Sequence, residues 1–418
     1  MREALEFNFF YSLPFWAAFL LVALSSLLLG RRGGARKISL LVFSGLLLTA
    51  LPNFSVSFLV ILSGLVAFSY LAGSLLNREG LLQRRGARRS ALVLGLAVVI
   101  AFLFVFKYPS IQRALSLGVG GQAASSGFLF FIGVSYFTFK MVHFLVESSK
   151  RKIESPDALT YANYILFFPS FISGPINRYN HFASQLNGQP KPATGEDWKV
   201  GAERIVNGLF KKFVLVQLLY PKIQELQSAG LSMPSGPLVV GLYAYALYFY
   251  LDFSAYSDLA IGSARILGIE LPENFNGPFF KKNIRELWTN WHMSLTSWLV
   301  DYIYWPIVRN LRSVDVFRSR PILLSNLGMI ITFVACGAWH GETLNFIIWG
   351  AYHGLGISAM TIYQREKRKV KSELAQRYFR SKLSRFAGVF FTFNFFVFGL
   401  AFFLFDMDEL RTLMSRLW

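Results

Sequence analysis

Apolar runs long enough to cross a bilayer recur along the whole chain and alternate with short polar segments. A crossing segment must satisfy its backbone hydrogen bonds internally, so long apolar runs of this kind are read as transmembrane helices. The pattern predicts an all-α polytopic membrane protein. The expected crossing helices cover residues 13–30, 38–51, 54–73, 91–106, 127–146, 205–220, 236–253, 321–340, 344–363 and 387–405. The first run lacks a basic region before it, so we expect a membrane span there and not a cleaved signal peptide.

Three further stretches do not fit simple crossing. Residues 161–176 contain Pro169 and Pro175, which interrupt a helix. Residues 256–267 are apolar but short and carry two charged side chains. Residues 286–308 predict one long helix with basic residues on both flanks, so it should enter and leave on the same side of the membrane. Irregular backbone at membrane depth persists only inside protein or beside a wet cavity, so these stretches predict an internal cavity.

The predicted helix over residues 286–308 carries an aromatic stripe. Its members recur at steps of three and four and therefore share one helix face: Trp288, Trp291, Leu295, Trp298, Tyr302 and Trp305. Tryptophan is enriched where a helix lies at the membrane–water interface, so the stripe is interpreted as the anchor of an interfacial helix. His292 lies beside the stripe, and Thr296 follows one turn later.

Composition supports the membrane interpretation, and charge refines it. The chain is 54% hydrophobic with 43 phenylalanines, more than a soluble core of this size needs, and its net charge is +19. The Lys and Arg residues gather in short loops at 31–37, 78–89, 150–152 and 365–385. The positive-inside rule and attraction to anionic lipid account for this charge, so no nucleic-acid partner is expected. These loops should be cytoplasmic, with the N- and C-termini extracytoplasmic.

Two of the five histidines are the candidates for chemistry: His292 and His340, each of which follows a tryptophan. An ionisable side chain inside a membrane costs a few kcal/mol or more, and proton transfer near neutral pH is a common reason to keep one. A metal site lacks convincing third and fourth ligands, and a packed core histidine is the remaining alternative. His353 stands inside Gly350-x-x-x-Gly354, where helix packing is expected.

The single cysteine, Cys336, excludes disulfides within the chain and cysteine-based metal sites. It precedes His340 by four residues, so a nucleophilic role is conceivable, but a buried and inert thiol is favoured. The chain contains no Walker A loop, GxGxxG, HExxH or GxSxG sequence. The chain therefore lacks a recognisable nucleotide-binding motif.

Six short motifs, taken in order, resemble the membrane-bound O-acyltransferase (MBOAT) family from about residue 50 to 405. They are residues 133–140 (GVSYFTFK), 167–176 (FFPSFISGPI), 252–258 (DFSAYSD), 271–275 (LPENF), 291–295 (WHMSL) and 339–341 (WHG). Residues 136–140, 173–179, 212–215 and 391–394 are most similar to the branch that transfers D-alanyl groups to teichoic acid. Residues 346–354 (FIIWGAYHG) are at least as similar to the sibling branch that acetylates exopolysaccharides such as alginate.

The resemblance implies one transmembrane domain over residues 1–418, a ring of about ten to eleven tilted helices around a central tunnel. It also implies transfer of an acyl group from a cytoplasmic thioester to a hydroxyl of an extracytoplasmic polymer. D-alanylation of a teichoic acid is the favoured reaction. O-acetylation of an exopolysaccharide or peptidoglycan is the alternative, and a channel or transporter for a small acyl compound or lipid is the non-enzyme alternative. The expected location is the plasma membrane of a bacterium.

Roles for particular residues also follow from the resemblance. His340 would be the general base, and His292 would orient or polarise the acyl carbonyl or line the path of the thioester arm. The candidates for lining the tunnel are Trp291, Trp339, Ser173, Asn274 and Asp258. Where the family often has two arginines before the Trp-His pair, this chain has Thr289 and Asn290, which puts a phosphate or carrier contact at that point in doubt.

The donor is expected to be a phosphopantetheine thioester on an acyl carrier protein, with acetyl-CoA as the alternative. No metal or cofactor bound by the chain itself is expected. Five basic residues are candidates for docking an acidic carrier: Lys281, Lys282, Arg285, Arg309 and Arg312. Contact with anionic lipid explains these five equally well. Other expected partners are membrane lipids and cell-envelope modification proteins on the outer face.

Overall fold

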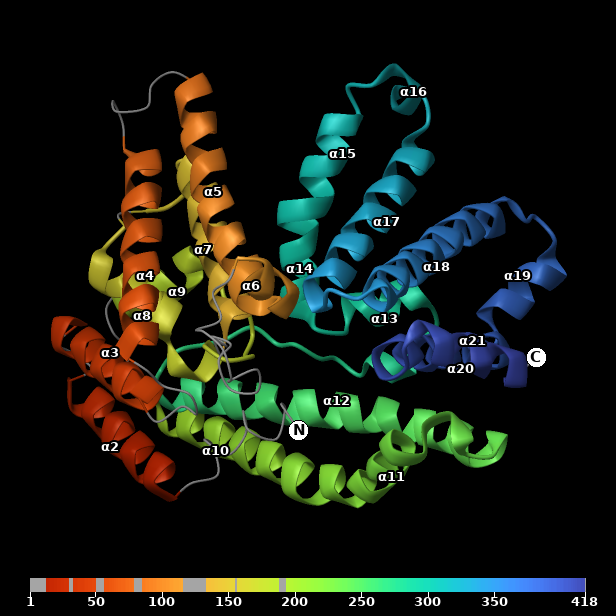
Figure 1. The fold of residues 1–418 in the computed structure, drawn as a ribbon, viewed down its shortest axis with the longest axis horizontal. Coiled ribbons are helices and arrows are strands. Elements are labelled where there is room, and N and C mark those ends of the chain that lie inside the picture. The colour runs from red at the N-terminus through yellow and green to blue at the C-terminus, as the bar shows by residue number, and fades with distance from the viewer. Residues whose placement is uncertain are drawn as a thin grey trace. The chain divides into compact units, whose positions relative to one another are not determined.

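A computed structural model describes residues 13–29, 33–49, 56–78, 85–115, 133–154, 156–187 and 193–417. Within these ranges every regular element is helical (Figure 1). Close contacts divide the chain into two compact units. Unit 1 contains residues 1–207 and 256–272, and unit 2 contains residues 208–255 and 273–418. The single domain over residues 1–418 stays a prediction.

Among the described residues, unit 1 contains all or most of nine labelled helices and part of a tenth. They are α2 (Leu13–Leu29), α3 (Gly33–Thr49), α4 (Val56–Asn77), α5 (Arg85–Lys107), α6 (Pro109–Ala114), α7 (Val134–Ser149), α8 (Ala158–Leu166), α9 (Tyr179–Asn187) and most of α10 (Gly195–Phe210). The last part of α12 (Ser235–Ile266) also belongs to this unit. The helices α4, α5 and α7 pack against one another, and α3 packs against α8.

Unit 2 begins with the last residues of α10, which a π-helical turn (Lys211–Leu215) joins to α11 (Val216–Ala229). The first part of α12 follows. Then come α13 (Ile284–Thr289), α14 (Met293–Leu299), a π-helical turn (Val300–Tyr304), α15 (Trp305–Leu311), α16 (Asp315–Arg318), α17 (Pro321–His340), α18 (Leu344–Lys369), α19 (Glu373–Arg380), α20 (Lys382–Leu404) and α21 (Met407–Leu417).

The helices confirm an all-helical chain that crosses a membrane several times. Among the described residues, five helices are long and apolar enough to cross: α4, α5, α12, α17 and α20. A shorter apolar helix covers Phe15–Leu29. The predicted span at 127–146 begins outside the described residues, and α7 accounts for the rest of it. The total of about ten to eleven crossing helices stays a prediction.

The separate short stretch predicted at residues 256–267 was wrong. It continues without a break from the span predicted at 236–253, and together they form α12, with 32 residues. The helix tolerates its buried acids because each one has a cationic partner. Within unit 2, Lys212 donates to Asp252. Within unit 1, Arg204 donates to Asp258 over 2.5 Å. Paired charges cost far less at depth than isolated ones, so the helix need not end at them.

The prediction of one helix over residues 286–308 was also wrong. The segment consists of α13, α14, a π-helical turn and α15, and the chain bends sharply at residues 290–292. Trp288, Trp291 and Trp298 are buried, at 8%, 4% and 5% exposed, whereas Trp305 is 46% exposed. The first part of the aromatic stripe therefore packs inside unit 2, so the interpretation as an interfacial anchor fails there.

In unit 1, one expectation from the sequence is confirmed and another is wrong. The interruption predicted within residues 161–176 is confirmed, because α8 ends at Leu166 and a short 3-10 turn (Phe168–Ser170) follows. Arg36 was assigned to a cytoplasmic loop cluster, but it is buried in α3, at 2% exposed. Its guanidinium donates to the carbonyl oxygens of Leu267 (2.7 Å) and Gly268 (3.3 Å), which follow the end of α12. A cation there satisfies carbonyl groups that the ended helix leaves without partners.

In unit 2 the helices α17 and α18 pack against each other, and glycine residues at the contact allow the two backbones to come close. A Cβ on Gly350 would lie 2.3 Å from the carbonyl oxygen of Phe333, and one on Gly354 would lie 2.8 Å from the Cα of Ile330. A Cβ on Gly337 would lie 2.1 Å from the carbonyl oxygen of Phe346. The packing role predicted for Gly350-x-x-x-Gly354 is therefore confirmed, since side chains at these positions would force the two helices apart.

Candidate active site

Unit 2 contains a cavity of about 320 Å³. Its wall combines side chains from α12, α13, α14, α17, α18 and α20, so segments far apart in sequence converge on it. His292 and His340 both line this cavity. Most of the remaining wall is aromatic or aliphatic, with a small number of hydroxyl and amide groups. A largely apolar cavity with few polar groups is the usual form of a small-molecule site.

One face of α17 runs along the cavity. The residues that line it recur at three- and four-residue steps: Ser325, Asn326, Met329, Thr332, Phe333, Cys336 and His340. At a rise of 1.5 Å per residue, the stretch from Ser325 to His340 measures about 22 Å. The cavity is therefore lined over a length that suits an extended chain-like ligand better than a compact one.

His340 ends α17 and is surrounded by aromatic rings. Its ring meets those of Trp349 and Phe403 edge-on, with centroids 5.0 Å and 5.1 Å away. The helix stops at this residue because Gly341 turns to an extended conformation, and a Cβ there would lie 2.2 Å from the ring of Phe346. The tight turn into α18 therefore presents the imidazole at the end of the cavity.

His292 sits at the break between α13 and α14. It is 6% exposed and its φ is +41°, in the left-handed region that a non-glycine residue adopts at a cost of about 1–3 kcal/mol. Its ring meets that of Phe253 edge-on with centroids 4.6 Å apart. A residue with a large side chain keeps a left-handed conformation only when the surrounding structure holds it, so neighbouring contacts must stabilise this turn.

An irregular segment at residues 273–276, here called the strap, holds the turn on both sides. The amide of Asn276 donates to the carbonyl of Asn290 (3.1 Å), and the amide of Met293 donates to the carbonyl of Asn274 (2.9 Å). In addition, the hydroxyl of Ser294 donates to the side-chain oxygen of Asn274 over 2.6 Å. Asn274 is fully buried and does not line the cavity. Its place in the structure is beneath His292, where it fixes the turn.

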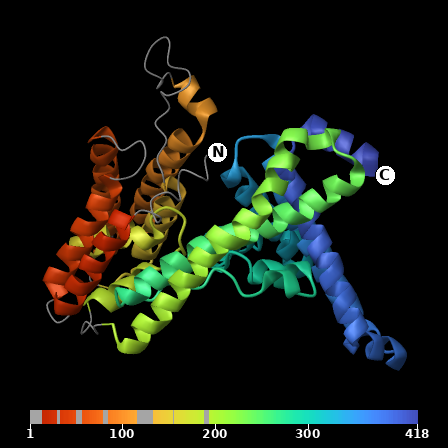
Figure 2. The same ribbon diagram turned by 90° about the horizontal axis from the view of Figure 1, so that it is seen from below.

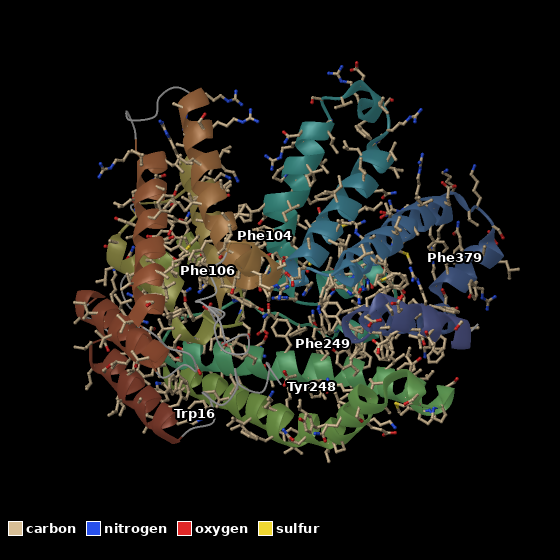
Figure 3. The ribbon with its side chains drawn as sticks, viewed as in Figure 1. Trp16, Phe104, Phe106, Tyr248, Phe249 and Phe379 are labelled. Carbon is tan, nitrogen blue, oxygen red and sulfur yellow. The ribbon has the colours of Figure 1, made fainter. Side chains whose placement is uncertain are left out.

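An aromatic wall completes the cavity next to His292. Trp291 lines it and stacks with the rings of Phe249 and Phe279, whose centroids each lie 5.8 Å away (Phe249 is labelled in Figure 3). Trp288 also lines the cavity, and its indole Nε1 donates to Nδ1 of His353 over 3.3 Å. His353 is fully buried outside the cavity. Sequence reasoning missed its bond to Trp288, because no local pattern links residues 65 apart.

The other candidates for lining the tunnel lie elsewhere. Trp339 is next to His340, but it does not line the cavity. Ser173 and Asp258 belong to unit 1, where Asp258 pairs with Arg204. Cys336 lines the cavity and is buried, as the sequence predicted. Among the described residues, no group of three or more His, Cys, Asp or Glu side chains is placed to hold a metal ion.

Of the five basic candidates for docking, Arg285 lines the cavity together with Thr289. Lys282, Arg309 and Arg312 are exposed, and Lys281 is partly exposed. Thr296, noted one turn after His292 in the sequence, also lines the cavity. Sequence reasoning did not single out four further polar lining residues: Ser325, Asn326, Thr332 and Thr361. The positions on α17 were detectable in principle, because they share one face of a predicted span with His340.

Comparison with known proteins gives consistent results. The model of the family described as "MBOAT, membrane-bound O-acyltransferase family" matches residues 93–405. A teichoic acid D-alanyltransferase of Bacillus subtilis is 33% identical over 247 residues, which are 58% of this chain and 61% of that protein. A probable alginate O-acetylase AlgI of Pseudomonas aeruginosa is 29% identical over 310 residues, which are 72% of this chain and 57% of that protein.

A teichoic acid D-alanyltransferase of Streptococcus thermophilus is 30% identical over 308 residues, 71% of each chain. By contrast, the chain spans less than two thirds of the length of the Bacillus and Pseudomonas proteins. The two kinds of relative match at similar identity. The matched region includes both cavity histidines, since the family model extends over residues 93–405.

Proposed function

Because the chain belongs to the membrane-bound O-acyltransferase family, we propose that it moves an acyl group from a thioester donor to a hydroxyl group of a cell-envelope polymer. The observation that carries this proposal is that His292 and His340, which come from different segments of unit 2, line the same cavity. Transfer from a thioester to an alcohol needs a base and a group that stabilises the oxyanion, and two histidines at one cavity match that need.

His340 is assigned the role of general base. An imidazole nitrogen takes the proton of the acceptor hydroxyl while the hydroxyl oxygen attacks the thioester carbonyl carbon. The tetrahedral intermediate then collapses, the carbon–sulfur bond breaks, and the proton passes from His340 to the departing thiolate. The rings of Trp349 and Phe403 pack edge-on against the His340 ring and restrict its orientation towards the acceptor hydroxyl.

His292 is assigned the role of orienting the acyl carbonyl. The strap fixes the turn that bears it, so the ring need not be ordered when substrate binds, and preorganised donors are the effective ones in oxyanion stabilisation. A hydrogen bond from a ring nitrogen to the carbonyl oxygen would strengthen as negative charge develops there. The two histidines therefore have separate roles, one on the acceptor hydroxyl and one on the donor carbonyl.

The donor is proposed to be a phosphopantetheine thioester on an acidic carrier protein. The length of the α17 face suits an extended arm, and its hydroxyl and amide groups suit the amides of such an arm. Arg285 lines the cavity, and Lys281 and Lys282 precede it, so a carrier bound there would have its arm close to the opening. The acyl group favoured is D-alanyl and the acceptor a teichoic acid, as in the name of the Bacillus relative.

A second reaction, O-acetylation of an exopolysaccharide, is favoured by one observation. The Pseudomonas relative, whose name states alginate O-acetylation, matches more of this chain than the Bacillus relative does, 72% against 58%. The two reactions share the chemistry at His340 and differ in the donor and the acceptor. We assign the protein to the plasma membrane of a bacterium, with both termini outside and the loop at 365–385 in the cytoplasm.

Donor binding tests the proposal and separates these reactions. Purified protein in proteoliposomes is titrated with an acyl carrier protein at low and high salt, and acetyl-CoA is tested in parallel. Electrostatic docking predicts weaker carrier binding once the Debye length falls below roughly 10 Å. Reversing the charge of Lys281, Lys282 and Arg285 should weaken carrier association while leaving the rate at saturating donor nearly unchanged.

The matched control reverses three exposed arginines of unit 1, namely Arg78, Arg85 and Arg89, and removes the same amount of positive charge. Carrier affinity should remain at the wild-type value in this control. Equal affinity of the wild type and both triple variants at both salt concentrations would contradict docking at Lys281–Arg285. Turnover with acetyl-CoA alone would then favour acetyl transfer.

A further inference from the structure

The segment between α18 and α20 combines cations with exposed apolar side chains. Residues 365–385 contain nine Lys or Arg and two Glu. Four apolar side chains in or next to this segment are strongly exposed: Leu374 (80%), Tyr378 (49%), Leu383 (66%) and Phe386 (70%). Together with Arg377, Arg380, Lys382 and Arg385, which are also exposed, they form what is here called the α19 surface. It lies apart from the cavity, and the proposed acyl transfer does not use it.

The helix α19 is amphipathic. Its apolar residues occupy positions 374, 375, 378 and 379, and its polar residues occupy positions 373, 376, 377 and 380, so the two kinds fall on opposite faces. Ser372 caps its first turn by accepting from the amide of Ala375, and Ser381 caps α20 by accepting from the amide of Ser384. An isolated helix of eight residues is marginal in water, so external contacts must stabilise α19.

One contact that stabilises α19 comes from the neighbouring helix α18. The ammonium of Lys367 in α18 lies 4.2 Å from the centre of the Phe379 ring (Phe379 is labelled in Figure 3). This contact ties one apolar residue of α19 to the rest of unit 2. Leu374 and Tyr378, which lie one turn apart, remain exposed. The helix is thus held in place while part of its apolar face stays available.

The position of α19 indicates what covers that face. It connects the C-terminal end of α18 to the N-terminal end of α20 (Figures 1 and 2). The helix α20 is one of those long and apolar enough to cross the membrane. A helix immediately before a membrane span, with its cations beside exposed apolar side chains, lies where headgroups meet acyl chains. Among the described residues, no carboxylate forms an ion pair with the four cations of the α19 surface.

We propose that the α19 surface binds anionic phospholipid, with its arginines and Lys382 on the headgroup phosphates and with Leu374 and Tyr378 inserted among the acyl chains. Attraction between a basic segment and an anionic leaflet supplies the charge term, and the apolar side chains supply the insertion. An acidic protein would satisfy the cations but would leave the exposed Leu374 and Tyr378, which precede the membrane span, without an apolar partner.

The test measures insertion directly and needs no enzymatic activity. In a Cys336→Ala background, Leu374→Cys is labelled with the environment-sensitive fluorophore NBD. The labelled protein is reconstituted into vesicles of phosphatidylcholine alone or of phosphatidylcholine with phosphatidylglycerol. Phosphatidylcholine brominated in its acyl chains is the quencher in both. The matched control is Gln376→Cys, on the polar face of the same helix, and each protein is first shown to elute as one monodisperse species.

The proposal predicts that brominated lipid quenches the label at position 374 at least roughly twofold more in vesicles that contain phosphatidylglycerol. The label at position 376 should be quenched weakly in both. Changing Arg377, Arg380, Lys382 and Arg385 to Gln should remove the dependence on phosphatidylglycerol, and free inorganic phosphate should not reproduce it. Equal quenching at 374 and 376, or quenching at 374 independent of phosphatidylglycerol, would overturn the proposal. Loss of quenching on addition of an acidic carrier protein would instead assign the surface to that partner.

Discussion

At the scale of single residues, the two histidines that stood out in the sequence both line one cavity together with Trp291, whereas the other candidates for lining a tunnel do not line it. An ionisable residue in an apolar segment is visible in sequence, because its cost demands a reason. The partners that hold such a residue are not visible. Asn274 was expected to line a tunnel, yet it lies buried beneath the His292 turn, and Asp258 pairs with an arginine 54 residues earlier.

The hydrogen bond between Asn274 and Ser294 gives a prediction about positioning. Asn274→Ala should lower kcat roughly 10- to 100-fold with little change in KM, because a catalytic side chain displaced by about 1 Å loses that much rate. Ser294→Ala removes the same hydrogen bond, and neither substitution removes the backbone bond between Met293 and residue 274, so the loss of kcat should be similar.

The double variant identifies the cause. If both residues act through one hydrogen bond, Asn274→Ala combined with Ser294→Ala should be no slower than Asn274→Ala alone. Steady-state rates with a saturating donor provide the measurement, and thermal unfolding of each variant monitors general loss of stability. Multiplicative losses in the double variant would contradict a shared role at the His292 turn.

At the scale of elements, apolar periodicity predicted most helices and failed where tertiary contacts override it. The aromatic stripe continues across residues 290–292, so no local signal marks the break between α13 and α14; the strap at residues 273–276 holds it. The reverse happened in α12, where the short length of residues 256–267 and the charges of Asp258 and Arg265 suggested a separate segment. The helix is continuous, and its two buried acids form ion pairs. Proline and glycine predicted helix ends more reliably, since α8 ends within the stretch where these residues predicted an interruption.

The contact between α17 and α18 predicts unequal effects of two glycine substitutions. Gly350→Ala should destabilise the protein by about 1–3 kcal/mol, because its Cβ would lie 2.3 Å from the backbone oxygen of Phe333 and the helices would have to separate. Gly45→Ala in α3 is the control, since nothing lies within 4 Å of its Cβ position. It should be neutral or stabilising by up to about 1 kcal/mol. Thermal unfolding in detergent measures both, and equal unfolding temperatures of the two variants would contradict the close packing.

The start of α8 gives a prediction about pH. Burial raises the pKa of Asp157, but hydrogen bonds from the Thr160 hydroxyl, from Lys37 and from the Thr160 amide outweigh it and lower the pKa from 3.8 to about 2. A carboxyl group with a lowered pKa in the folded state stabilises it above pH 3.8. That stabilisation is lost as the pH falls through about 2.

Asp157→Asn should therefore flatten part of the acid dependence of stability. Hydrogen exchange of the first amides of α8, followed between pH 5 and pH 2, measures the effect for the wild type and the variant. Wild-type protection should decline towards the acid end of this range, and protection in the variant should change less. Parallel declines in both proteins would show that another group is responsible.

At the scale of the whole molecule, the sequence predicted the class of protein, and the family match over residues 93–405 agrees with it. Hydropathy and loop charge carry that information because the bilayer imposes both. The arrangement of the cavity wall could not be predicted in the same way. It depends on contacts between segments such as residues 249–253, 285–300 and 325–340, which are brought together only by folding.

The assigned topology predicts which positions react with an impermeant thiol reagent. In a Cys336→Ala background, a cysteine at Gln376 should remain unlabelled in intact spheroplasts and react after permeabilisation, because the 365–385 loop is assigned to the cytoplasm. A cysteine at Asp408, in α21, should react without permeabilisation. Labelling of position 376 from outside would reverse the assigned orientation.

The most direct test of the account is acyl transfer by His340→Ala in proteoliposomes loaded with acyl carrier protein donor. The variant should elute as a monodisperse species and bind donor normally, yet transfer should fall by about 10²–10⁴-fold, the usual contribution of a general base. His181→Ala, which changes an exposed histidine of unit 1, should keep the wild-type rate. Retention of more than about a tenth of the wild-type rate by His340→Ala would contradict the assignment of His340 as the base.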